Sequence, residues 1–450
     1  MIRVMILAYF LWFFVFLKLL LFWLWLWQLK EYHWGRFRAH FETQAFKKIL
    51  SSLWRLRYPK FTFKASAILA ACLILEFFLL FSFGLFSVII LTLVLLPLLV
   101  FCAQVITAIW RSFVIAEAAK KRSEMKSLLT IGITGSFGKT STKEFLATIL
   151  GEKFSSEKVL KTKEHQNSEI GVSLCILNDL KQKHEIFICE MGAYKKGGIK
   201  LLADIVRPKI GVVTGVNEQH LSTFGSMENL LSSEGGKELI DSLPEDGMAF
   251  FNAKNEHCRT LYEATTIKKF LYGEEAKNFS EENLLGAMTV AKELGMTDKE
   301  IAKAAGKIPN KLPGINIKTS SLRITVIDAS YSANPTGVLA HLEYLKTLRQ
   351  AQGKLVIVMP CLIELGSASA EIHRRVGQKI TQVCDLAIIT TNDRFDEIRE
   401  TAGEKAELLE RADEIFAKIK SFCREGDTVL LEGRVPDKLI QQLTINNESV

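Results

Sequence analysis

Two long apolar stretches dominate the first quarter of the chain. Residues 5–27 hold one charge, Lys18, and the 45 residues from 66 to 110 also hold one, Glu76. A helix needs about 20 apolar residues to cross a bilayer, so the second stretch is long enough for two crossings. The pattern predicts three transmembrane helices, over about residues 5–27, 66–84 and 87–110, in a membrane region of residues 1–126.

From residue 127 onward, short apolar and β-branched runs alternate with stretches of helical periodicity. Strands spaced by helices predict parallel sheets covered on both faces. A Pro-Asn-Lys-Leu-Pro-Gly segment at residues 309–314 interrupts the helical pattern and marks a joint. We therefore predict two α/β domains, at residues 127–308 and 309–450. The predicted strands are residues 128–133, 185–190, 210–214, 248–252, 324–328, 355–359, 386–390 and 428–432.

Charge is distributed unevenly between these regions. Residues 1–126 carry 16 basic and 5 acidic side chains, a net charge of +11, which leaves −3 for the rest of a chain whose total is +8. Nine Lys or Arg lie in residues 28–64, and the positive-inside rule places that loop in the cytoplasm. We expect a multi-pass protein of the inner membrane, with membrane lipid as a partner, cytoplasmic catalytic domains and no nucleic-acid partner.

A glycine-rich turn joins the first soluble strand to a helical run. Strand, turn and helix in this order form a phosphate cradle, in which backbone N–H groups face the anion, Lys139 reaches the terminal phosphates and Thr140 can hold Mg²⁺. The strict P-loop pattern has a glycine where Ile133 stands, and a turn without a ligand is the alternative. We predict a P-loop ATPase-like parallel-sheet domain that binds a nucleoside triphosphate, followed by a Rossmann-like α/β domain. The predicted nucleotide contacts here are Gly135, Ser136, Phe137, Gly138, Lys139, Thr140 and Ser141.

Two further polar residues follow predicted strands. Glu190 ends the strand at residues 185–190, and His220 lies six residues past the strand at residues 210–214. Ligands of open parallel sheets sit at the carboxyl ends of the strands, so both side chains can reach the glycine-rich turn. Because Mg²⁺ prefers oxygen ligands, a carboxylate near Thr140 predicts a magnesium–nucleotide site. Taken alone, His220 is equally compatible with a satisfied core histidine.

Six motifs in a fixed order, spread over residues 127–450, resemble those of the Mur ligase family, closest to the branch that adds a dipeptide to a muramoyl peptide. The motifs are Thr134-Gly-x-x-Gly-Lys-Thr-Ser, Asn167-x-x-Ile-Gly, Glu190-Met-Gly-Ala, His220-Leu-x-x-Phe-Gly-Ser, Leu243-Pro-x-Asp-Gly and Asp328-x-x-Tyr-x-Ala-Asn-Pro.

This resemblance implies an ATP-dependent ligase that forms an amide through an acyl phosphate in cell-wall peptide synthesis. ATP and Mg²⁺ are the implied cofactors. The implied substrates are a carboxylate-bearing peptide or muramoyl peptide and an amino acid or dipeptide amine. Carried over by motif, Lys139 and His220 are catalytic, Thr140 and Glu190 hold one Mg²⁺, and His220 serves a second metal.

The resemblance also places nucleotide contacts outside the glycine-rich turn. Asn283 matches an asparagine near the adenine. A loop of the C-terminal domain that closes over nucleotide and substrate supplies Asp328, Tyr331 and Asn334.

Departures from the family pattern affect substrate recognition and the second metal site. The family has a carbamate-modified lysine upstream of the Leu-Pro pair, and this chain has Gly236 at that position. Two alternatives are open. Either Lys237, one place later, serves as the catalytic lysine, or Glu234 supplies an oxygen instead. The family's C-terminal Lys-Gly-Ser begins here with Glu432. Membrane helices also stand in place of the soluble domain that holds a uridine nucleotide.

Three functions fit these observations. The first is a ligase of cell-envelope peptides whose carboxylate substrate is linked to lipid or polymer. The second is a ligase of another polymer such as poly-γ-glutamate. The third is a degenerate membrane scaffold that binds ATP without ligation, suggested by Gly236 and Glu432 in place of family lysines.

Overall fold

The computed structural model describes most of the chain and divides it into two compact units, Met1–Val114 and Ile115–Val450. The described residues are 2–29, 56–83, 108–163, 166–308, 316–320, 322–330, 333–348 and 353–444. The division falls before residue 126, the predicted end of the membrane region, and lies within the helix over residues 108–124.

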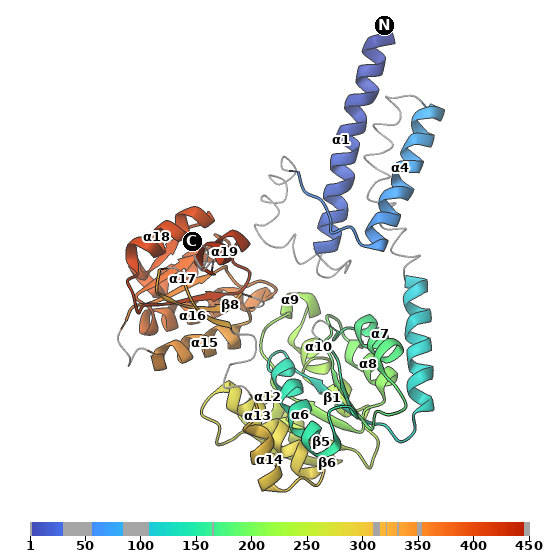
Figure 1. Cartoon of the computed structure of the whole chain (residues 1–450), viewed down its shortest axis with the longest axis vertical. Helices are drawn as coiled ribbons and strands as arrows, with labels where there is room; N and C mark the ends of the chain where they lie inside the picture. Colours follow the sequence, from blue (N-terminus) through green and yellow to red (C-terminus); the bar gives the residue numbers. More distant parts are fainter. Residues whose placement is uncertain are drawn as a thin grey trace, which may run out of the picture. The chain divides into compact units, whose positions relative to one another are not determined.

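In the first unit, α1 (Ile2–Leu29) and α4 (Phe63–Phe83) pack side by side (Figure 1). Trp12 Nε1 donates a 2.7 Å hydrogen bond to Oε1 of the buried Glu76. Residues 6–28 and 65–82 are long and apolar enough to span a membrane, and less than a third of each is buried. Two of the three predicted spans thus coincide with helices, and the third, at residues 87–110, lies largely outside the described residues.

The first soluble domain is a six-stranded sheet in the order β2-β3-β1-β4-β5-β6, with every neighbouring pair parallel. Strand residues alternate between two cores, because successive side chains of a strand point to opposite faces. Ile131 and Ile133 pack under α6, α13 and α14, whereas Phe187 and Cys189 pack under α7 and α8. The strands are β1 (Leu129–Thr134), β2 (Val159–Lys161), β3 (Ile186–Glu190), β4 (Ile210–Val213), β5 (Met248–Asn252) and β6 (Lys268–Tyr272).

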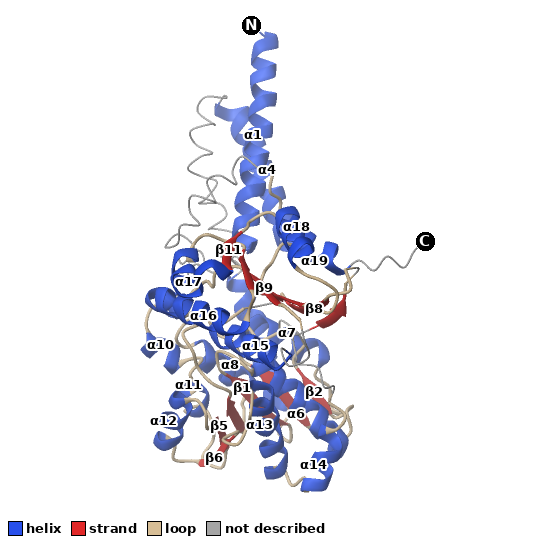
Figure 2. Ribbon diagram, turned by 90° about the vertical axis from the view of Figure 1, so that its left-hand side faces the viewer, coloured by secondary structure: helices blue, strands red, loops and turns tan. Residues whose placement is uncertain are grey.

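The helices that the structure describes in this domain connect the strands or follow the last of them (Figure 2). They are α6 (Lys139–Phe154), α7 (Glu169–Asp179), α8 (Gly198–Val206), α9 (Leu221–Phe224), α10 (Met227–Ser232), α11 (Lys237–Ile240), α12 (Glu256–Ala264), α13 (Phe279–Glu293) and α14 (Asp298–Ala305).

The second domain is another six-stranded sheet, ordered β11-β10-β9-β12-β8-β7. It is parallel except for the edge strand β7, which pairs antiparallel with β8 and was not among the predicted strands. The predicted strands pair parallel with one another in both sheets. The strands are β7 (Asn316–Thr319), β8 (Thr325–Ala329), β9 (Leu355–Met359), β10 (Leu386–Ile389), β11 (Ala406–Leu408) and β12 (Thr428–Glu432).

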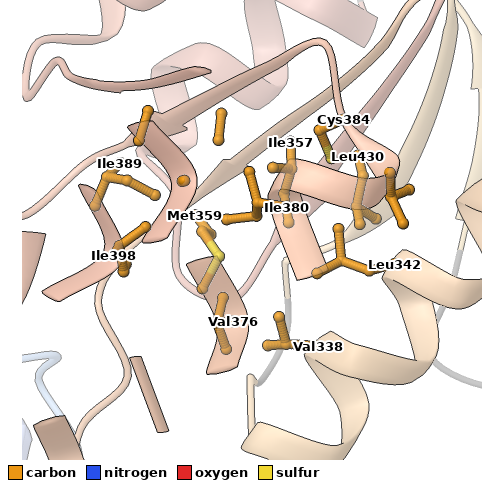
Figure 3. Packing of buried hydrophobic residues seen from close by; sticks show 14 of the residues in the cluster. Val338, Leu342, Ile357, Met359, Val376, Ile380, Cys384, Ile389, Ile398 and Leu430 are labelled. Atoms are coloured by element: carbon orange, nitrogen blue, oxygen red, sulfur yellow. The ribbon is translucent and has the colours of Figure 1, made fainter. Parts of the chain in front are cut away.

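Helices cover both faces of this sheet as well. Val338 and Leu342 of α15 pack with Val376 of α16 against Ile357 and Leu430 (Figure 3). The helices α18 and α19 pack on the opposite face. The helical segments are α15 (Pro335–Leu348), η2 (Gly366–Ala368), α16 (Ser369–Val383), α17 (Phe395–Ala402), η3 (Gly403–Lys405), α18 (Ala412–Phe422) and α19 (Asp437–Thr444).

A buried arginine attaches the helix over residues 108–124 to the first soluble domain. The Arg122 side chain is 6% exposed, and its guanidinium donates to backbone and hydroxyl oxygens. Buried charges are costly unless their donors are satisfied, and the planar five-donor guanidinium suits a ring of acceptors. The acceptors are the Thr130 hydroxyl and the carbonyls of Met125, Leu128, Val206 and Arg207.

Candidate active site

The glycine-rich turn lies at the carboxyl end of β1, where Thr134 ends the strand and Lys139 begins α6. Gly138 precedes the helix with φ of 77°, a left-handed conformation that favours glycine. A Cβ at this position would also collide with the Asn283 side chain. The turn therefore leaves the backbone N–H groups at the start of α6 open to an anion, as a phosphate cradle requires.

Contacts with the end of β4 hold the turn in shape. Ser136 N donates to Gly215 O at 2.8 Å, and the Thr214 hydroxyl donates to the Phe137 carbonyl. The Lys139 ammonium rests on the Gly135 carbonyl of the same turn. A lysine held this way is placed over the cradle that it is predicted to serve.

Glu190 is the acceptor at the centre of the site, at the end of β3 beside β1. Its carboxylate accepts from the Thr140 hydroxyl at 3.0 and 3.1 Å and from Asn167 Nδ2 at 3.2 Å. Burial alone would raise the pKa of Glu190, but the positive charges of Lys143 and Lys139 outweigh it and hold the pKa below its usual range. Glu190 is therefore an ionised carboxylate beside the predicted metal-binding threonine.

Lys143 is a site residue that the motif analysis missed. Its side chain is fully buried, and Nζ lies 3.1 Å from Glu190 Oε2. The spacing from Lys139 could have revealed it, because residues four apart lie on the same face of a helix. Lys139 and Lys143 thus both place positive charge near Glu190, and Lys143 does so from a buried position.

His220 contacts two carboxylates, neither of which is Glu190. Its Nδ1 lies 3.3 Å from Oε1 of the buried Glu234, and its Nε2 lies 3.6 Å from Glu364 Oε2. Glu234 also accepts from Ser136 Oγ at 3.2 Å, so it connects the glycine-rich turn to His220. Burial raises the pKa of Glu234, but the His220 and Lys139 charges outweigh it and lower the pKa.

Neither position 236 nor Lys237 suits the role of the family's modified lysine, whereas Glu234 contacts the glycine-rich turn. Gly236 has φ of 94°, and a Cβ there would lie 2.5 Å from Val213 Cγ2, so this backbone does not accommodate a lysine at 236. Lys237 is 60% exposed and pairs with Asp241 at 2.7 Å. The sequence left Lys237, as the modified lysine, and Glu234 as alternatives for this part of the site. Of these two side chains, Glu234 is the one that contacts the glycine-rich turn.

Asn283 lies on α13 against the glycine-rich turn. It is buried, and its Oδ1 accepts from the Thr142 hydroxyl at 3.3 Å. The neighbouring Phe279 packs edge-on against Phe137, with ring centroids 5.6 Å apart. These contacts support the turn from the α13 side, and an adenine contact by Asn283 stays a prediction.

The C-terminal domain contacts the central domain through Asn334 and Thr336 at the start of α15, as well as through Glu364. Asn217 Nδ2 donates to Thr336 Oγ1 at 2.6 Å and to Asn334 Oδ1 at 3.3 Å. Asp328 at the end of β8 accepts from Ser330 N and Oγ, within its own loop. Tyr331 lies outside the described residues. Of the predicted loop residues, Asn334 is the one seen to contact the central domain.

Within the described ranges, no three His, Cys, Asp or Glu side chains are grouped in a way that could hold a metal. The pair Thr140 and Glu190 still fits Mg²⁺, which takes few protein oxygens when phosphates and waters complete its octahedron. His220 lies apart from this pair, with Glu234 and Glu364, and its role at a second metal stays a prediction.

Comparison with known proteins connects this geometry to a family. Residues 133–317 match the Mur ligase middle domain, and residues 316–435 match the Mur ligase glutamate ligase domain. The UDP-N-acetylmuramoyl-tripeptide--D-alanyl-D-alanine ligase of Bacillus subtilis is 26% identical over 355 residues, 71% of this chain and 76% of the relative. The enzyme of the same name from Escherichia coli is 26% identical over 344 residues, 67% of this chain and 73% of the relative.

Solved structures agree on the fold. MurF from Acinetobacter baumannii matches with a TM-score of 0.64 and 22% identity over 74% of this chain and 80% of that one. MurF from Thermotoga maritima, solved in complex with ADP, matches with a TM-score of 0.64 and 24% identity over 74% of this chain and 83% of that one.

Proposed function

Because this chain belongs to the Mur ligase family, we propose that it is an ATP-dependent carbon–nitrogen ligase of peptidoglycan precursor synthesis that joins a D-alanyl-D-alanine dipeptide to a muramoyl tripeptide. The observation that carries this proposal is the arrangement of Lys139, Thr140 and Glu190 around a turn held open at the start of α6. The names of the relatives support the choice of substrates, and the order of the six motifs supports the reaction type.

In the proposed reaction, an oxygen of the tripeptide carboxylate attacks the γ-phosphorus of ATP, and ADP leaves. The amine nitrogen of the dipeptide then attacks the acyl carbon, the C–N bond forms, and the C–O bond to phosphate breaks. Phosphoryl transfer leaves little covalent work for the protein, so positioning and charge neutralisation account for the catalysis.

Each site residue has a role in that scheme. The Lys139 ammonium releases the Gly135 carbonyl and binds the terminal phosphates. The N–H groups of residues 138–140 bind the adjacent phosphate oxygens. Thr140 and Glu190 would hold Mg²⁺, which when bound neutralises phosphate charge. Lys143 keeps Glu190 ionised and fixed in place before nucleotide arrives.

Glu234 fills the role that a carbamate-modified lysine has in the family. A glutamate is a permanent carboxylate, and it already contacts Ser136 of the turn and His220. We therefore propose that Glu234 supplies the negative charge of this part of the site without any modification, and that His220 is positioned by Glu234 and Glu364. The catalytic role first assigned to Lys237 is not part of this proposal.

We further propose that the first unit anchors the enzyme in the inner membrane with the catalytic domains in the cytoplasm. Large apolar side chains of α1 and α4 face away from the helix pair, among them Phe10, Phe14, Phe77 and Phe81. Such faces suit a lipid environment, and the basic loop at residues 28–64 suits anionic headgroups. Anchoring raises the effective concentration of a lipid-linked carboxylate substrate at the site.

The test uses the full chain purified in detergent with Mg-ATP, UDP-muramoyl tripeptide and D-alanyl-D-alanine. We expect ADP release that depends on both substrates and a product whose mass equals the ligated pentapeptide. Lys139→Ala should abolish the product, whereas Lys153→Ala, at the other end of α6, should not. ATP binding without substrate-dependent ADP release would contradict the proposal and favour the scaffold function. ADP release with glutamate but not with muramoyl tripeptide would favour the poly-γ-glutamate ligase.

A further inference from the structure

A buried pair of titratable residues in the C-terminal domain takes no part in the site described above. Glu432 ends β12 and is fully buried, and its Oε2 lies 2.6 Å from His341 Nδ1 on α15. The other carboxylate oxygen, Oε1, is buried and has no hydrogen-bond partner among the described residues. Burial of a carboxylate is costly unless it is well paired, so this pair is a poor choice for stability alone.

The pair lies close to the loop before α15, one of the places where the C-terminal domain contacts the central domain. Glu432 is followed by Gly433, where a Cβ would lie 2.8 Å from Ala333 Cβ, next to Asn334. Asn334 in turn contacts Asn217 of the central domain. Glu432 also stands at the carboxyl end of a parallel strand, the edge of an open sheet at which ligands bind.

The geometry gives the two residues different parts. Nδ1 of His341 faces the buried carboxylate, which leaves Nε2 on the outer side of the ring, where none of the described residues hydrogen-bonds it. His341 keeps 20% of its side chain exposed, so it is the accessible member of the pair. A buried carboxylate that orients an imidazole is the arrangement by which a histidine is prepared to accept a proton.

The charged side chains near His341 form ion pairs that do not compete with Glu432 for the imidazole. Its one described ion-pair partner is Glu432. On the same helix, Glu343 pairs with Lys346 and with Lys379 of α16. Burial raises the pKa of Glu432, and the hydrogen bond with His341 offsets part of that rise.

We propose that His341, oriented by Glu432, accepts the proton that the amine substrate loses when it attacks the acyl phosphate. This inference rests on the proposed ligase function. As the nitrogen forms its bond to the acyl carbon and phosphate leaves with the electron pair of the C–O bond, the excess proton on nitrogen passes to Nε2. His341 then carries two N–H groups, and Glu432 stabilises the resulting positive charge.

The experiment separates amine attack from formation of the acyl phosphate. Full-length enzyme in detergent receives Mg-ATP, UDP-muramoyl tripeptide and either D-alanyl-D-alanine or hydroxylamine. Hydroxylamine is largely unprotonated at neutral pH and traps acyl phosphates as hydroxamates without a protein base. We expect His341→Gln to lower amide formation about 100-fold, the size of a general-base effect, while hydroxamate formation stays within about twofold of wild type.

Companion variants exclude a merely structural role. Glu432→Gln should lower amide formation about tenfold and leave the thermal unfolding midpoint near that of wild type. Glu343→Gln, on the same helix, should behave as wild type.

Three outcomes would overturn the inference. Equal loss of amide and hydroxamate in His341→Gln would show damage to the whole site, and unchanged amide formation would show that the pair has no role. A wild type that yields neither product would contradict the ligase function itself and the inference with it.

Discussion

The ammonium of Lys143 lies 3.1 Å from Oε2 of Glu190, with the lysine side chain wholly excluded from solvent. The same carboxylate accepts from the Thr140 hydroxyl in the first turn of α6. One helix thus supplies both the buried cation and the hydroxyl that fix the carboxylate at the end of β3. The acidic residue of the proposed metal site is pre-organised by the strand–turn–helix unit that forms the phosphate cradle.

Replacement of Lys143 by methionine should be strongly destabilising. It leaves Glu190 buried without its nearest cation, and breaking a buried ion pair from one side costs about 3–5 kcal/mol. The free energy of unfolding, measured by denaturant titration of the full chain in detergent, checks this value. The double variant Lys143→Met/Glu190→Gln should recover much of the loss, because no unpaired charge remains. A single variant as stable as wild type would contradict the assigned pairing.

Stability should fall in acid because of Glu190 and Glu234, whose pKa values in the folded chain are both lowered. A lowered pKa in the folded state means that the unfolded chain binds the proton more tightly. Their contribution is complete above the unfolded glutamate pKa of about 4.3 and is lost as the pH falls through the folded values. Unfolding free energies measured from pH 7 to pH 3 should decline less steeply in Glu190→Gln than in wild type.

Ligase activity should not depend on bicarbonate. Glu234 is a built-in carboxylate, so removal of carbon dioxide and bicarbonate from the buffer should leave the rate unchanged. Glu234→Gln should lower kcat/KM about tenfold or more, which corresponds to loss of about 1.4 kcal/mol of electrostatic stabilisation. An intact-mass measurement that found a carbamate on Lys237, or a rate that rose with bicarbonate, would refute this assignment.

Gly236→Ala should destabilise the central domain more than Gly225→Ala. Both glycines have positive φ, 94° and 78°, so both variants incur backbone strain of about 1 kcal/mol. Only at 236 does the new methyl also meet a neighbour, Val213 Cγ2 at 2.5 Å, whereas nothing lies within 4 Å at 225. Thermal unfolding of the two variants measures the difference. Equal shifts in the unfolding midpoint would mean that the 236 site relaxes freely.

The strands that the sequence predicts are those in the interior of the two sheets. All eight predicted strands form, and the four that were missed, β2, β6, β7 and β11, are the edge strands of the two sheets. Interior parallel strands are buried on both faces and appear as continuous apolar runs, whereas all four residues of the edge strand Asn316–Thr319 are exposed. An exposed strand leaves no hydrophobic pattern in the sequence.

Site residues followed a similar division. The turn at residues 135–140 and Glu190 could be predicted because each occupies a strand end within a contiguous motif. Lys143 was missed although it lies four positions from Lys139, a spacing that could have revealed it. Glu364 could not be predicted, because its contact with His220 depends on which side chains the fold brings together. Gly236 illustrates the same limit: counting positions selected it, but the left-handed backbone and Val213 determine that a lysine does not fit there.

Arg122 determines where this polypeptide can be divided. Its guanidinium joins the helix over residues 108–124 to five oxygens of the chain that follows, including carbonyls more than 80 positions away. A fragment that began at residue 127 would keep the whole nucleotide site. It would lack Arg122, so the buried oxygens that accept hydrogen bonds from this side chain would lose their donor. The practical cutting point therefore lies upstream, before Ile115, where the compact unit begins. The helix over residues 108–124 is therefore the first structural element of the catalytic part of the chain.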